Sequence, residues 1–100
     1  MRRTVWKYLL KISSAEQVLE LPLGAKMVHV GLDPGASEGG PTVWAEVDPD
    51  EARMIKHRFW VHGTGHDIPP GRDHLGSVID PPFAWHVYHS QELNKYGSDY

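Results

Sequence analysis

Aromatic and cationic side chains alternate with apolar ones along several predicted strands of this chain. The apolar positions, which predict the core, are Val28, Val30, Val43, Ala45, Val47, Ile55, Phe59 and Val61. The alternate positions carry His29, Trp44, Glu46, Lys56, Arg58, Trp60 and His62. A face that only meets solvent normally holds Thr, Lys, Glu and Ser with few tryptophans. Because indoles stack on flat ligands and guanidinium groups bind phosphates, this face predicts contact with a flat, anionic ligand.

The same composition is typical of a second core or a subunit interface, where Trp and Arg are also enriched. The two interpretations are compatible, because a small protein can build a pocket between two copies. Both therefore stay open.

A Gly-Thr-Gly-His segment at 63–66 follows a predicted strand directly. The two glycines permit unusual backbone angles, and successive amides in such a turn can hold an anion. Thr64 would add a hydroxyl and His66 a ring donor, while Arg72 could close over the anion. A plain strand exit would also explain these glycines. The predicted ligand-binding residues are His29, Trp44, Arg58, Trp60, His62, Gly63, Thr64, Gly65, His66 and Arg72.

Seven histidines raise the questions of metal binding and of catalysis. His62 and His66 are four positions apart, but the glycines between them argue against a helical zinc motif, so no metal site is expected. A histidine beside Asp67 or Asp73 could act as a general base. No serine lies in a nucleophile elbow, so no catalytic residue is assigned and the protein is expected not to be an enzyme.

Length and composition restrict the class of protein. One hundred residues, 40% apolar and 23% charged, suit a single globular domain without cysteine-based crosslinks or metal sites. The net charge of −3 argues against duplex nucleic acid as a partner. No apolar stretch predicts a signal peptide or a membrane span, and the segment at 37–40 lacks the ending of a phosphate-binding P-loop. We expect a cytoplasmic protein without a cofactor.

Alternating patterns separated by Gly- and Pro-rich turns predict short strands throughout. Their ranges are 4–12, 17–21, 26–32, 42–47, 53–62, 74–79 and 83–88. The short connections predict that 26–32 pairs with 42–47, and 74–79 with 83–88. Six or seven such strands predict a mainly β fold, a small antiparallel sheet or sandwich with little helix. Residues 1–89 would form this domain, and 90–100 a polar C-terminal tail.

Six blocks in order carry a resemblance to a known family. They are Thr-Val-Trp-Lys-Tyr at 4–8, Glu-Leu-Pro-Leu-Gly-Ala-Lys-Met-Val-His-Val at 20–30, Val-Trp-Ala-Glu-Val-Asp-Pro at 43–49, Gly-Thr-Gly-His-Asp-Ile-Pro at 63–69, Leu-Gly-Ser-Val at 75–78 and Phe-Ala-Trp-His-Val-Tyr at 83–88. Over residues 4–88 they resemble a family of small uncharacterised proteins of bacteriophages and prophages. The loop at 35–41 and the tail from His89 depart from that pattern.

The resemblance implies a phage protein acting in the cytoplasm of a bacterial host. Small phage β-proteins include virion accessories and inhibitors of host defence, and some inhibitors enclose cyclic nucleotide or cyclic ADP-ribose signals. With the aromatic and cationic face, this predicts a binding protein that sequesters a nucleotide-derived immune signal. A homo-oligomer is expected, because one small subunit can hardly enclose a nucleotide. The alternatives are a hydrolase that degrades such a signal, and a protein-interaction module or virion accessory.

Overall fold

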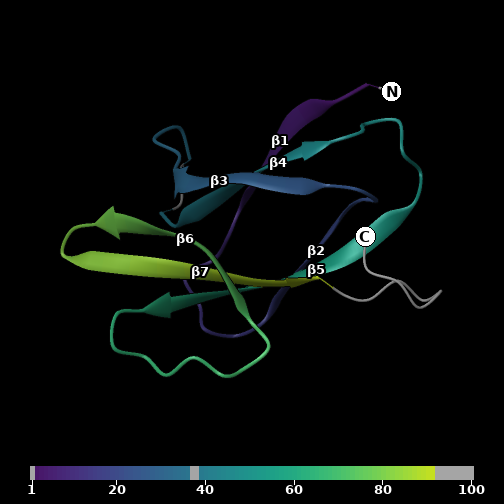
Figure 1. Ribbon diagram of the computed structural model, residues 1–100. Helices are drawn as coiled ribbons and strands as arrows, with labels where there is room; N and C mark the ends of the chain where they lie inside the picture. The colour runs from purple at the N-terminus through teal and green to yellow at the C-terminus, as the bar shows by residue number, and fades with distance from the viewer. Residues whose placement is uncertain (1, 37–38, 92–100) are drawn as a thin grey trace.

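The computed structural model describes residues 2–36 and 39–91. All regular structure in this part of the chain is β-strand, in two sheets (Figure 1). The strands are β1 (Thr4–Leu9), β2 (Gln17–Pro22), β3 (Lys26–Leu32), β4 (Pro41–Val47), β5 (Met54–Gly63), β6 (Asp73–Asp80) and β7 (Phe83–Gln91). The prediction of a mainly β fold of six or seven strands is confirmed.

All strand pairs within the two sheets are antiparallel. The first sheet has the order β1-β4-β3 and the second the order β2-β5-β7-β6. The predicted pairs are present as the β3–β4 pair and the β6–β7 hairpin. Sequence-adjacent strands β4 and β5 lie in different sheets, so the chain crosses from one sheet to the other after Val47.

The two sheets enclose a small apolar core. Its buried members are Leu10, Val43, Phe59, Val61 and Val87, with a second group of Leu21, Ala45 and Val47. Both sheets contribute, because alternate residues of β4 face the alternate residues of β5 and β7. Five of the eight predicted core residues, Val43, Ala45, Val47, Phe59 and Val61, are fully buried.

Val28 is a wrong assignment to the core. Its side chain is 47% exposed, whereas its neighbour Met27 packs against both apolar groups. The register of β3 against β4 shifts between Met27 and His29, which is a β-bulge. An extra residue in one strand reverses the alternation of faces on either side of it. Strict alternation therefore placed Val28 inside when the bulge turns it out.

Strand β5 is buried on both of its faces over its second half. Phe59 and Val61 belong to the core, but Trp60 and His62 are also buried, at 6% and 4% exposure. Strand β5 lies between β2 and β7, so both of its edges are hydrogen-bonded to neighbouring strands. Side chains from other parts of the chain must therefore cover its outer face. Trp60 and His62 are therefore buried, as the alternative of a second core expected, and do not form an exposed ligand-binding face.

The two sheets approach each other closely at Gly76 in β6. A Cβ atom added there would lie 3.0 Å from the Cβ of Val30 in β3, tighter than side chains normally pack. Glycine is needed here because of the short distance between the strands.

We expect Gly76→Ala to lower the free energy of unfolding by about 1–3 kcal/mol, because overpacking forces the backbones of β3 and β6 apart. Urea unfolding followed by tryptophan fluorescence would measure the change. Gly39→Ala is the matched control, since a Cβ atom at Gly39 meets nothing within 4 Å. Equal stability of the two variants would contradict the close approach.

Two histidines on the inner side of the second sheet form a pair. The Nδ1 atom of His57 lies 2.8 Å from the Nε2 atom of His89, and the rings are stacked with centroids 5.0 Å apart. Burial, and then the charge of His89, lower the pKa of His57 to about 4. Burial also lowers the pKa of His89, against a smaller opposite effect of Asp73. At neutral pH both rings are uncharged, one donating the hydrogen bond and the other accepting it.

This pair predicts a loss of stability in mild acid. Below pH 6.5 the unfolded chain protonates His57 while the folded chain does not, so the free energy of unfolding falls as pH drops from 6.5 towards 4. His57 alone accounts for roughly 3 kcal/mol over that range. Urea unfolding at several pH values would measure it. His57→Gln should flatten the dependence and His29→Gln, an exposed histidine in β3, should retain it. The same pH dependence in both variants would count against the pair.

The described C-terminal end of the domain lies two residues beyond the predicted boundary. Ser90 and Gln91 belong to β7 and pair with β5, so they are part of the sheet. The remaining positions of the predicted tail, 92–100, lie outside the described residues. Nowhere in the described ranges is there a helix of the length and apolar character needed to cross a membrane.

Candidate functional site

The predicted aromatic and cationic face is divided between the two sides of the sandwich. His29 and Trp44 lie in the first sheet, with Trp44 between the core residues of β4, so it faces away from the second sheet. Arg58, Trp60 and His62 lie on the outer side of the second sheet. The prediction that these residues form one surface is therefore wrong, because the chain changes sheets between β4 and β5.

On the outer side of the first sheet, His29 and Trp44 contact only each other among the predicted site residues. Their ring centroids are 5.3 Å apart in a tilted arrangement. The ammonium of Lys7 reaches Asp33 at 2.6 Å on the same sheet. This side of the molecule is thus separate from the Gly-Thr-Gly-His segment.

On the outer side of the second sheet, the arginines already have protein partners. The guanidinium of Arg72 lies over the Trp60 ring, 4.0 Å from its centroid, in a cation–π contact. Its Nη1 atom is 3.0 Å from Nε2 of His62. Arg58 forms an ion pair with Glu16 at 3.3 Å. The Trp60 face that was predicted to stack on a ligand is covered by Arg72.

The contact with Arg72 determines the protonation state of His62. Arginine can only donate, so Nε2 of His62 must accept and the ring is neutral with its proton on Nδ1. Burial, and then the positive charges of Arg72, His66 and His86, lower the pKa of His62. His62 therefore anchors Arg72 as a neutral acceptor.

Removing the guanidinium should raise the pKa of His62. In Arg72→Gln the imidazole ring of His62 loses a neighbouring positive charge and becomes more exposed to solvent. Both changes favour the protonated form of His62. NMR titration of the histidine ring protons would follow the midpoint. Arg53→Gln, which removes a cation just before β5, is the control and should leave the midpoint in place. An unshifted His62 in Arg72→Gln would show that the two groups do not interact.

The Gly-Thr-Gly-His segment is a closed turn at the end of β5. The amide of His66 donates to the carbonyl of Gly63 at 3.2 Å, and the amide of Gly63 donates to Nδ1 of His66 at 3.2 Å. Gly65 has φ of 91°, a left-handed conformation that favours glycine in the third position of a turn. The Gly63 amide that could have held an anion is thus used by the His66 ring.

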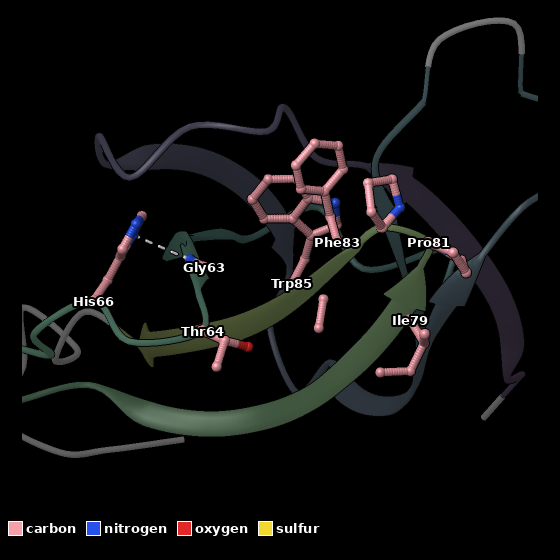
Figure 2. A pocket seen from close by; sticks show the side chains of 9 residues that line it. Gly63, Thr64, His66, Ile79, Pro81, Phe83 and Trp85 are labelled. Carbon is pink, nitrogen blue, oxygen red and sulfur yellow. Dashed lines mark hydrogen bonds between the residues drawn. The ribbon is translucent and has the colours of Figure 1, made fainter.

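A pocket of about 570 Å³ lies between this turn and the tip of the β6–β7 hairpin (Figure 2). Its size is within the range of small-molecule sites. It is lined by Gly63, Thr64, His66, Ile79, Pro81, Pro82, Phe83, Ala84 and Trp85. Three predicted site residues, Gly63, Thr64 and His66, are brought together here with a mostly apolar wall.

Two aromatic rings dominate that wall. Phe83 stacks on Trp85 with centroids 5.4 Å apart and an interplanar angle of 25° (Figure 2). Phe83 is 55% exposed and its neighbour in the pocket, Ile79, is 69% exposed. The indole Nε1 of Trp85 is buried and has no hydrogen-bond partner among the described residues. A buried donor without an acceptor is costly to the fold.

The aromatic wall was missed at the sequence level. Phe83 and Trp85 are two apart, so they point to the same side of a strand, which was a usable signal. The sequence does not show that Gly63 of β5 pairs with Trp85 of β7. This pairing brings the 63–66 turn beside the β6–β7 hairpin. In the described ranges, no group of three or more His, Cys, Asp or Glu side chains could hold a metal ion.

Over residues 2–36 and 39–91, fold and pocket together define a seven-stranded antiparallel β-sandwich with an open, aromatic-lined pocket at the end of its larger sheet. The chain belongs to the family described as a domain of unknown function (DUF7352), which it matches over residues 1–97. Comparisons with curated proteins and with solved structures found no match.

Proposed function

We propose that this domain binds a small, flat, nucleotide-derived ligand in the pocket between the 63–66 turn and the β6–β7 hairpin, and releases it unchanged. The observation that carries the proposal is the exposed ring of Phe83, stacked on the half-buried Trp85, in a pocket of about 570 Å³. An aromatic ring on a protein surface is a stacking platform for a base of any identity. Thr64 and His66 add polar groups on the opposite wall.

The apolar residues at the hairpin tip favour a ligand over plain solvent contact. Ile79 and Phe83 both line the pocket and expose more than half of their surface. Covering such surface with a ligand releases water and contributes roughly 25 cal/mol for each Å² buried.

The resemblance to phage proteins extends this proposal to a biological role, the sequestration of a cyclic nucleotide or cyclic ADP-ribose signal in an infected cell. The open side of the pocket is consistent with a second copy completing the enclosure. Hydrolysis of the same ligand, and a purely protein-binding role, are the alternatives.

One experiment separates these three roles. The protein is incubated with a panel of nucleosides, cyclic nucleotides and cyclic ADP-ribose, washed, heated to release what it holds, and analysed by mass spectrometry. Recovery of an intact ligand supports binding without conversion. An altered product would instead indicate a hydrolase, and no retained compound would contradict the proposal and favour a protein-interaction module.

Truncation of the exposed ring tests the site. Phe83→Ala removes a stacking contact worth about 1–3 kcal/mol, so the Kd should rise about five- to a hundred-fold. Calorimetric titration with the ligand recovered above would measure it. Trp44→Ala is the matched control, because it removes an aromatic ring from the outer side of the other sheet. The two variants must melt near the parent, and equal affinities would place the site elsewhere.

A further inference from the structure

A chain of hydrogen bonds runs over the outer side of the second sheet and links Thr64, a predicted site residue, to three residues that were not predicted. The hydroxyl of Thr64 is 2.7 Å from Nε2 of His86, and Nδ1 of His86 is 2.7 Å from the hydroxyl of Ser77. The same Ser77 hydroxyl is 2.9 Å from Nε2 of His74. Two hydroxyl groups and two imidazole rings therefore alternate along one line.

Strand register holds these groups together. Ser77 of β6 lies directly opposite His86 of β7, and His86 lies opposite His62 of β5. The rings of His62 and His74 both contact Tyr88 edge-on, with centroids 5.5 Å and 5.3 Å away. Three neighbouring strands thus converge on a polar patch whose side chains are rigidly placed.

A cation lies beside this patch. The guanidinium of Arg72 is 3.0 Å from Nε2 of His62, which lies opposite His86 in the neighbouring strand. An anion placed at the patch would be attracted by this guanidinium.

The patch is continuous with the pocket of the proposed function. Thr64 belongs to both, since it lines the pocket and bonds to His86. The pocket residues Ile79 and Ala84 lie two positions from Ser77 and His86 on the same face of their strands. Phe83 and Trp85 lie on the other side of β7, the side of the core residue Val87, so a ligand that contacts both Phe83 and this patch has to pass the edge of β7 that β5 leaves unpaired beyond Gly63.

We propose that Thr64, His74, Ser77 and His86 form an anion subsite that binds the phosphate group of a ligand held in the adjoining pocket, which Thr64 also lines. This inference rests on the proposed function and adds the phosphate to it. The two hydroxyl groups can each donate or accept, so the chain reorients to present hydrogen-bond donors to an anion. The exposed positions of Thr64, His74 and Ser77 leave the subsite open to the ligand.

The test compares adenosine, adenosine 5′-monophosphate and inorganic phosphate on the full chain, by calorimetry and by NMR of the histidine rings. The monophosphate should bind about tenfold or more tightly than adenosine, because it adds charge-assisted hydrogen bonds. Ser77→Ala and His86→Gln should remove that preference while binding of adenosine is retained. His29→Gln, on the other sheet, is the control and should keep the preference.

Equal affinities for adenosine and its monophosphate would overturn the subsite while leaving the proposed function intact. A preference that persists in both Ser77→Ala and His86→Gln would also overturn it. If neither nucleotide compound binds, the proposed function fails for this base, and inorganic phosphate then decides the subsite by itself. Shifts of the His74 and His86 signals on phosphate addition, absent in Ser77→Ala, would support it, and unshifted signals would refute it.

Discussion

Burial of β5 on both faces is the constraint on which the rest of this structure depends. Its inner residues Phe59 and Val61 pack in the core, and its outer residues Trp60 and His62 are covered in part by Arg72. The strand also pairs with β2 on one edge and β7 on the other. Because both neighbours and both faces are occupied, β5 is a rigid reference to which the 63–66 turn is attached.

The rigidity of β5 explains where binding groups remain available. Arg58 and Arg72 are engaged by Glu16, Trp60 and His62, so the outer face near the middle of β5 is occupied by the protein itself. Past Gly63 the strand ends, and the pocket opens between the turn and the exposed ring of Phe83. Ile79 and Phe83 are exposed at this end of the second sheet, so a ligand can contact them without disturbing the core.

The histidines show how one residue type serves different purposes in a small domain. His57 and His89 are neutral partners inside the sandwich, and burial holds their pKa values below the ordinary one. His62 is an acceptor for a guanidinium, while His74 and His86 bracket the hydroxyl of Ser77 on an exposed strand pair. Burial and the nearest partner, rather than position in the sequence, assign each role.

Local patterns determined much of the fold: alternating residues and Gly- and Pro-rich turns predict the strands, the β6–β7 hairpin and most of the core, because these depend on neighbours in the chain. The assignment of Val28 to the core was wrong because a β-bulge of one residue reverses the alternation of inward and outward side chains. The assignment of β4 and β5 to different sheets placed Trp44 and Trp60 on opposite sides, and no short-range pattern encodes that choice. The sequence by itself thus determined the strands and the Gly-Thr-Gly-His turn. Only the tertiary structure decided which side chains meet, since the pocket and the Ser77–His86 contact depend on pairing between strands far apart in the chain.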